Sequence, residues 1–349
     1  MFRITSFILF CFCILFTPMT YAAEEEKKLY IYAWYNEIPN EVVEQFQNET
    51  GIDVVIATYN DNEILYAKLK ASPRSGFDLV MPSNYYVERM SKQGMLDVID
   101  LSKLPNHKQV PKQFANPEYD LNNHFSIPFL WGSTGIFVNK KFHDSNTIHR
   151  WSDLTEKKYL NKVMLLNDAR EVFSIALISQ GLNPNSEDPK EIKQAYDFLI
   201  KLLSNIRVFN SDSLPSIFID EDLTVGMAWN GDVYRGKKEN SDLEYIYPDD
   251  GFILWVDCFA IPKFAPHPNN AHRFLNFMLR PEISAKATIH FGYATANAGA
   301  KAFLPEHMRN SPIIFPSDQQ LKHSHFQRNL SPEALQMYSN YWEALKLNA

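Results

Sequence analysis

The chain contains the run Phe252-Ile-Leu-Trp255-Val-Asp257-Cys-Phe-Ala-Ile-Pro262, which is mostly apolar and rich in residues that favour β-strands. We therefore predict a buried strand here. Successive side chains of a strand point to opposite faces, so Trp255 and Asp257 share one face. A carboxylate that is held away from water needs a cation or hydrogen-bond donors. Either the protein or a ligand must supply that partner for Asp257.

Strands and helices alternate on both sides of this run, as the spacing of the apolar residues indicates. Strands are predicted at residues 29–34, 53–58, 77–81, 163–167, 225–229 and 253–261, with two short strands around Gly132 and Gly135. Helices are predicted at residues 39–50, 62–71, 169–180, 189–203, 269–279, 281–291 and 332–347. This alternation is typical of the α/β class, in which helices cover both faces of a parallel sheet.

The chain has 349 residues and no flexible linker, which favours two α/β lobes between which the chain crosses more than once. We assign residues 24–132 with 257–301 to lobe 1, and residues 133–256 with 302–349 to lobe 2. A ligand cleft is expected between the lobes. In open α/β sheets ligands bind at the carboxyl ends of strands, where Trp34 and the loop of residues 82–86 lie.

The first 23 residues are predicted to be a secretory signal peptide. Arg3 is the only charged residue among them, and residues 7–16 form an apolar run of ten that is too short to span a bilayer. Small residues at Ala22 and Ala23 suit cleavage. An uncleaved anchor is the alternative, which the polar residues 24–28 disfavour. We therefore expect a periplasmic protein.

The composition excludes some classes of protein. Loss of Arg3 takes the formal net charge from −7 to −8, so nucleic acid is a poor candidate for a partner and cations are reasonable ones. After cleavage only Cys258 remains, which leaves no intramolecular disulfide. Cys258 is interpreted as a small buried apolar side chain. We expect a monomer without a metal or other cofactor.

Enzyme motifs are few. Gly231-Asp-Val-Tyr-Arg-Gly236-Lys237-Lys238 fits a phosphate-binding loop except at its last position, which lacks the hydroxyl that binds Mg²⁺, so a polar helical turn explains it better. His323 and His325 are interpreted as surface residues.

Asp168 and Glu171 lie three residues apart at a predicted helix start. Such a pair suits acid–base chemistry, but for either residue alone we favour a helix cap at Asp168 and a favourable dipole interaction at Glu171.

Aromatic and acidic residues occur together at the ends of the predicted strands or in the adjacent loops. They are Trp34, Tyr85, Trp229, Trp255 and Tyr293, with Asp168, Glu171 and Asp257. Methylene groups stack on rings, ammonium groups gain cation–π contacts of about 0.5–2 kcal/mol, and carboxylates make charge-assisted hydrogen bonds. The set as a whole indicates a site for a small organic polycation.

The chain also resembles the periplasmic spermidine/putrescine-binding proteins of ABC polyamine importers over nearly all of its mature length. The motifs that carry the resemblance are Tyr32-Ala-Trp34, Asp78-Leu-Val-Met-Pro-Ser83-Asn-Tyr85-Tyr86, Ile127-Pro-Phe-Leu-Trp131-Gly, Asp168-Ala-Arg-Glu171-Val-Phe, Phe209-Asn-Ser-Asp212, Trp229-Asn-Gly, Trp255-Val-Asp257, Phe277-Met-Leu-Arg280-Pro281 and Gly292-Tyr293-Ala-Thr-Ala-Asn297. The resemblance implies two α/β lobes that close on a ligand by a hinge, and an inner-membrane ABC permease as partner.

The resemblance also implies roles for individual residues. The five aromatic side chains named above wall the polyamine, Asp168, Glu171 and Asp257 hold its ammonium groups, and Ser83 and Gln327 add polar contacts. One departure stands out: where the family has an acid after the first-strand Trp, this chain has Trp34-Tyr35-Asn36-Glu37. Either Glu37 replaces that carboxylate from one residue further on, or one amine is held more weakly, or a polyamine of another length is preferred.

We therefore expect a solute receptor that is not an enzyme. Three alternatives stay open at this stage. The first is a module that senses a polyamine for a membrane signalling protein. The second is a secreted hydrolase that uses Asp168 and Glu171, which requires a carboxyl group with a strongly raised pKa. The third is a receptor of the same fold for another solute, such as ferric iron or a sugar.

Overall fold

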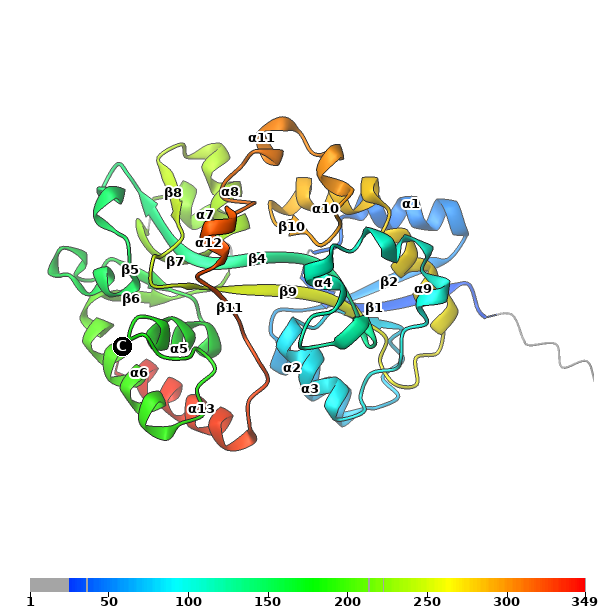
Figure 1. The fold of residues 1–349 in the computed structure, drawn as a ribbon, viewed down its shortest axis with the longest axis horizontal. Helices are drawn as coiled ribbons and strands as arrows, with labels where there is room; N and C mark the ends of the chain where they lie inside the picture. Colours follow the sequence, from blue (N-terminus) through cyan, green and yellow to red (C-terminus); the bar gives the residue numbers. More distant parts are fainter. Residues whose placement is uncertain (1–24, 36, 213, 222, 349) are drawn as a thin grey trace, which may run out of the picture.

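The fold is organised around two long strands that are buried along their whole length, β4 (Ser126–Asn139) and β9 (Phe252–Ala260). They pair antiparallel, with Gly132 opposite Trp255 and Leu130 opposite Asp257. In the computed structural model, which describes residues 25–35, 37–212, 214–221 and 223–348, both strands run from one half of the molecule into the other (Figure 1). They are therefore two of the segments that join the halves.

The strands form one mixed sheet in the order β2-β1-β3-β9-β4-β7-β5-β6. Strands β1, β2 and β3 pair parallel at one end, and β5, β6 and β7 pair parallel at the other. The flanking strands are β1 (Lys28–Trp34), β2 (Asp53–Tyr59), β3 (Leu79–Val80), β5 (Val163–Leu165), β6 (Ile206–Phe209) and β7 (Val225–Trp229). Short pairing segments are β8 (Leu243–Ile246), β10 (Ala294–Thr295) and β11 (Ser324–Phe326).

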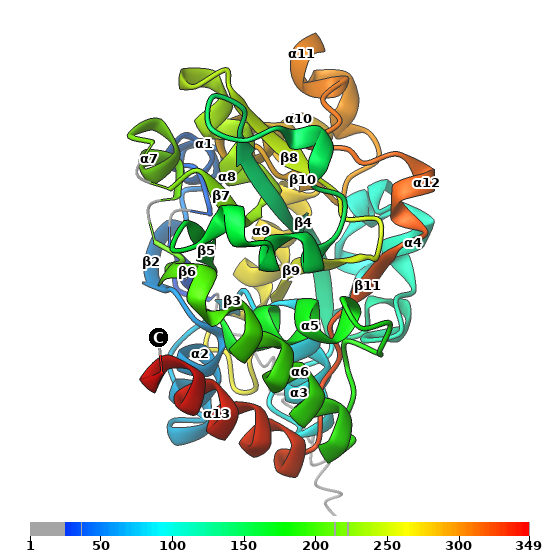
Figure 2. The same ribbon diagram turned by 90° about the vertical axis from the view of Figure 1, so that its left-hand side faces the viewer.

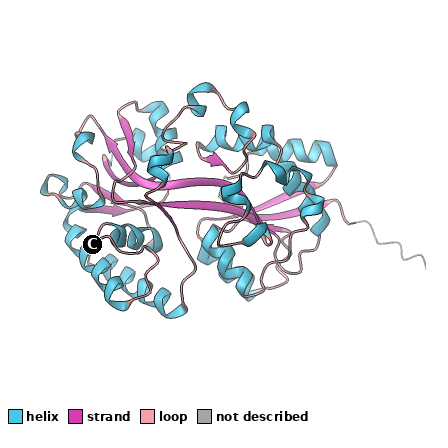
Figure 3. Cartoon of the chain, in the orientation of Figure 1, coloured by secondary structure: helices cyan, strands magenta, loops and turns pink. Residues whose placement is uncertain are grey.

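Helices surround this sheet in both halves, as the colouring by secondary structure shows (Figure 3). On the side of β1 they are α1 (Asn40–Thr50), α2 (Asn62–Ala71), α3 (Asn84–Lys92), α4 (Lys112–Ala115), α9 (Pro268–Met278), α10 (Pro281–Phe291) and α11 (Glu306–Arg309). On the side of β5 they are α5 (Ala169–Ile178), α6 (Pro189–Leu202), α7 (Leu214–Ile219), α8 (Asn230–Glu239) and α13 (Pro332–Leu347), and α12 (Asp318–Leu321) lies on the connection between the sides. Helix α13 packs against α6 (Figure 2). Within the described residues no helix combines the length and apolar character needed to cross a bilayer.

Two separate hydrophobic cores give the molecule its two lobes. One contains Phe46, Tyr86 and Phe274, and the other contains Trp151, Phe173 and Tyr338, among many others. Strand β9 contributes to both cores, which identifies it as a crossing segment. The two-lobed α/β fold predicted from the sequence is confirmed. The numerical lobe boundaries remain a prediction. The last segment of lobe 2 was predicted to begin at residue 302, but Leu304 and Met308 pack in the core of lobe 1, which favours a later boundary.

Three local predictions were wrong. The two short strands around Gly132 and Gly135 are one strand, β4, because both glycines continue the antiparallel pairing with their neighbours. The sheet is mixed, since β4 and β9 run antiparallel to each other, β9 is antiparallel to β3, and β4 is antiparallel to β7. The segment 82–86 is no simple loop: α3 begins at Asn84, where the β-favouring Tyr and Val residues become helical through their buried packing.

Several short elements were not predicted at all, namely β6, β8, β11 and α7, because segments of three to six residues show too little periodicity. The polar helical interpretation of residues 231–238 is confirmed by α8, and Cys258 is a fully buried free cysteine as expected.

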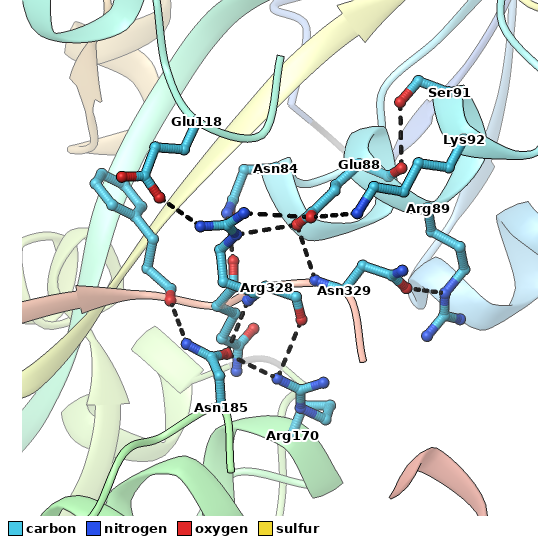
Figure 4. A network of polar contacts seen from close by, with 12 residues as sticks. Asn84, Glu88, Arg89, Ser91, Lys92, Glu118, Arg170, Asn185, Arg328 and Asn329 are labelled. Atoms are coloured by element: carbon cyan, nitrogen blue, oxygen red, sulfur yellow. Dashed lines mark hydrogen bonds and ion pairs between the residues drawn. The ribbon is translucent and has the colours of Figure 1, made fainter. Parts of the chain in front are cut away.

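A third connection between the lobes follows β11, which pairs parallel with β9. Arg328 on this connection binds Glu88 of α3 through Nε at 3.1 Å and Glu118 through Nη1 at 2.5 Å (Figure 4). The backbone N–H of Arg328 donates to Asn185 Oδ1 in the other lobe at 2.8 Å. Burial favours a raised pKa for Glu88, yet hydrogen bonds from Arg328 and Lys92 hold that pKa below its ordinary value. The connection is thus fixed to both lobes.

We predict that Arg328→Gln lowers the free energy of unfolding by about 1–3 kcal/mol, because it removes charged donors from a buried carboxylate. Urea titration at pH 7 measures this loss. The control Lys193→Gln breaks an exposed ion pair with Asp197 and is expected to leave the free energy of unfolding nearly unchanged. Equal losses in the two variants would contradict the structural role of Arg328.

Candidate functional site: a cavity between the lobes

A cavity of about 400 Å³ is lined by residues from both lobes. Its wall is built from the ends of β1 and β7, the first turns of α2, α3, α5 and α8, the middle of β9 and the segment after β11. This volume lies within the range of roughly 300–1,000 Å³ that is typical of small-molecule sites. The strand ends and helix starts of the two sheets therefore meet at one site, as the α/β pattern predicts.

Eleven of the twelve predicted site residues line this cavity. They are Trp34, Glu37, Ser83, Tyr85, Asp168, Glu171, Trp229, Trp255, Asp257, Tyr293 and Gln327. The twelfth, Asn36, lies outside the described residues. The structure thus brings together side chains that are up to 293 positions apart in the chain, although their roles in binding stay a prediction.

The alternation predicted for β9 is confirmed. Trp255 and Asp257 both line the cavity, whereas Val256 and Cys258 are fully buried in packing. The Trp255 ring meets Tyr293 edge-on, with centroids 4.9 Å apart. A Cβ at Gly132 on the paired strand would lie 2.3 Å from the Trp255 ring, so only glycine leaves room for the indole at that point.

The carboxylate of Asp257 is held by the neighbouring lobe 1 loop. Ser83 Oγ donates to Asp257 Oδ1 at 2.6 Å, and Asn62 Nδ2 donates in turn to Ser83 Oγ at 3.1 Å. Ser83 also precedes the first turn of α3, which fixes its position. This chain of hydrogen bonds orients one oxygen of Asp257 and leaves a buried acidic group facing the cavity.

At the opposite lobe, Asp168 and Glu171 occupy the start of α5. Asp168 Oδ1 accepts a hydrogen bond from the Glu171 backbone N–H at 3.0 Å, so Asp168 caps the helix. Both side chains also line the cavity, and Glu171 Oε2 is buried without a hydrogen-bond partner. The helix cap predicted at Asp168 is confirmed, and the position of both side chains in the cavity wall is compatible with the ligand-facing role, which stays a prediction.

Glu37 reaches the cavity from the loop after β1. Its Oε2 atom is buried without a hydrogen-bond partner. Burial raises its pKa well above the ordinary value, and the charges of Asp257 and Asp232 raise it further. Of the explanations offered for the unusual Trp34-Tyr35-Asn36-Glu37 run, this position favours a carboxylate supplied from one residue further on.

The cavity is strongly acidic. Among the described residues, the carboxylates of Glu37, Asp168, Glu171, Asp212, Asp232 and Asp257 line it, against a single guanidinium from Arg235. Burial raises the pKa of Asp257 to about 7, and burial with the Asp168 charge raises that of Glu171 to about 8. Burial also raises the pKa values of Asp168 and Asp232. A cation beside these groups would favour their ionised form.

Sequence analysis missed half of the lining residues. The missed set is Tyr35, Asn60, Asn62, Ser211, Asp212, Leu214, Pro215, Ser216, Asp232, Arg235 and Phe291. Asp232 and Arg235 lie in the segment that had been set aside as a polar helix. Their i, i+3 spacing at a helix start after the aromatic strand end at Trp229 was the available signal. No group of three or more metal-ligating side chains occurs in the part of the chain that the structure describes.

The model of one protein family, the bacterial extracellular solute-binding proteins, matches residues 41–316. The chain belongs to this family. Its members include the spermidine/putrescine-binding periplasmic protein 1 of Haemophilus influenzae, 42% identical over 319 residues that cover 91% of this chain and 88% of that protein. The spermidine/putrescine-binding periplasmic protein of Escherichia coli is 37% identical over 324 residues, or 93% of each chain. These relatives are solute-binding proteins.

Solved structures of this solute-binding family agree with the fold. A spermidine/putrescine ABC transporter protein from Listeria monocytogenes has a TM-score of 0.88 and 31% identity, covering 93% of this chain and all of that one. A substrate-binding protein of a spermidine/putrescine ABC transporter from Streptococcus pneumoniae has a TM-score of 0.82 and 32% identity over 93% and 99% of the two chains.

The raised pKa of Asp257 gives a test of stability against pH. Between about pH 4 and pH 7 the folded protein keeps a proton on Asp257 that the unfolded chain has lost, so this group destabilises the fold as pH rises. We predict that the stability of Asp257→Asn relative to the wild type increases by about 3 kcal/mol between pH 5 and pH 8.

Urea unfolding of the protein without ligand at both pH values measures this difference. The control Asp197→Asn replaces an exposed carboxylate and should follow the wild type at both values. A constant difference between Asp257→Asn and the wild type from pH 5 to pH 8 would refute the prediction.

Proposed function

We propose that this chain is a periplasmic receptor that binds a polyamine, spermidine or putrescine, between its two lobes and delivers it to an inner-membrane ABC permease. The observation that carries the proposal is the cavity itself. Six carboxylates and five predicted aromatic wall residues line one cavity, with one guanidinium among the described lining residues. That combination suits a flexible chain of methylenes that ends in ammonium groups.

We assign a part of the ligand to each group as part of this proposal. Asp168 and Glu171 take an ammonium group at the lobe 2 end, and Asp257 with Glu37 takes one at the lobe 1 end. Trp34, Tyr85, Trp229, Trp255 and Tyr293 cover the methylenes between them, and Ser83 and Gln327 complete the polar contacts. Gln327 is 2% exposed, and its position is fixed because its backbone carbonyl accepts from Asn84 Nδ2 at 2.8 Å.

The names of the relatives agree with this chemistry. Relatives at 37–42% identity are named spermidine/putrescine-binding, and more distant relatives at 31–33% identity are named putrescine-binding. Transport, a cleaved signal peptide at residues 1–23, monomeric state and the absence of enzymatic activity belong to the same proposal. The raised pKa of Glu171, which a hydrolase requires, does not favour that alternative, because Glu37 and Asp257 have raised pKa values too.

Isothermal titration of the protein with putrescine, spermidine, spermine and glutamate tests the proposal. We expect heat with at least one polyamine and none with glutamate. Binding should weaken below about pH 6 as the carboxyl groups keep their protons, and it should weaken with added salt. A flat titration with all three polyamines at pH 8 would overturn the proposal.

A substitution tests the part played by Asp257. We predict that Asp257→Asn lowers spermidine affinity by about 10–100-fold at pH 8, because it removes a charge-assisted hydrogen bond and keeps the shape of the side chain. Asp197→Asn, on the surface, serves as the matched control and should bind as the wild type does. Undiminished affinity in Asp257→Asn would refute the role of this carboxylate.

A further inference from the structure

The first two turns of α8 place a carboxylate and a guanidinium in the wall of the cavity. Asp232 and Arg235 lie three residues apart and form an ion pair through Asp232 Oδ1 and Arg235 Nη2. The other oxygen of Asp232 accepts a hydrogen bond from Tyr293 Oη at 3.0 Å. The side chain of Asp232 is 7% exposed and that of Arg235 is 30% exposed. Both oxygens of Asp232 are therefore engaged by the protein.

This pair faces the lobe 1 end of the cavity. The negative charges of Asp257 and Asp232 raise the pKa of Glu37, and the positive charge of Arg235 lowers it. Arg235 Nε is buried without a hydrogen-bond partner and belongs to a side chain that lines the cavity. Three carboxylates and one guanidinium thus share one end of the site. Asp168 and Glu171 lie at the start of α5, where the charge of Arg170 acts on both of them.

We propose that Arg235 is a specificity-determining residue, which cancels the charge of Asp232 and so disfavours the more highly charged polyamines. With Arg235 in place, Glu37 and Asp257 are the carboxylates left at this end for ammonium groups. Each additional positive charge on a ligand meets the guanidinium across the buried cavity, where charge interactions are weakly screened. Spermine therefore loses more affinity than putrescine does. This inference rests on the proposed polyamine function.

The test is the ratio of spermine affinity to putrescine affinity, measured by isothermal titration at pH 8. Arg235→Gln removes the guanidinium and leaves Asp232 to the ligand, so the ratio should rise by about tenfold. Asp232→Asn leaves Arg235 uncompensated in the cavity, so the ratio should fall by about as much. The two variants move the ratio in opposite directions, so either suffices if the other fails to fold.

Three further variants separate charge from structure. Arg235→Lys keeps the charge and should restore the wild-type ratio. The double variant Asp232→Asn with Arg235→Gln has the same net charge at this place as the wild type, so its ratio should return to within about threefold of the wild-type value. Lys238→Gln removes the same charge from an exposed position on the same helix and should leave the ratio unchanged.

The outcomes distinguish this inference from the proposal beneath it. Absence of heat with every polyamine in the wild type overturns the proposed function and this inference with it. Polyamine binding by the wild type, together with equal loss for putrescine and spermine in Arg235→Gln and in Asp232→Asn, overturns this inference alone. That result would identify the ion pair as a purely structural contact of α8.

Discussion

The antiparallel pairing of β4 with β9 is the constraint on which the rest of the molecule depends. It carries the backbone through both hydrophobic cores and holds Trp255 opposite a glycine, which leaves space for the indole at the cavity. The same register places Asp257 beside Ser83 of lobe 1. Lobe architecture and site geometry therefore follow from one pair of strands, in which every residue is buried.

The structure also accounts for how charge is tolerated inside the protein. Hydrogen bonds from backbone or hydroxyl groups satisfy one oxygen of Asp168 and one of Asp257, while Glu37 and Glu171 each have a buried oxygen without a protein partner. Incompletely satisfied carboxyl groups are costly in a protein interior. Their concentration in one cavity supports the proposal that this cavity is the binding site, because groups with perturbed pKa values cluster at functional sites.

Much of this could be predicted from the sequence. Alternation along β9 predicted which faces Trp255 and Asp257 share, and the caps of α5 and α6 marked the starts of those helices. The sequence could not show that α3 begins within a run of β-favouring residues, because packing against β9 decides that conformation. Asp232 and Arg235 were not predicted as lining residues, because the sequence pattern of a polar helical turn is the same whether the turn faces solvent or a cavity. Only the fold of the second lobe brings that turn to Glu37.

The raised pKa values of Glu171 and Asp257 have a consequence for how any cation enters the site. Near neutral pH these carboxyl groups hold protons for a large fraction of the time. A cation that pairs with them must displace those protons into the surrounding solution, so occupancy of the cavity and acidity of the compartment are thermodynamically linked. The measured heat of occupancy then includes the ionisation heat of the buffer. Binding of a cation at these carboxyl groups is therefore expected to depend on pH within the range in which exposed carboxylates are already fully ionised.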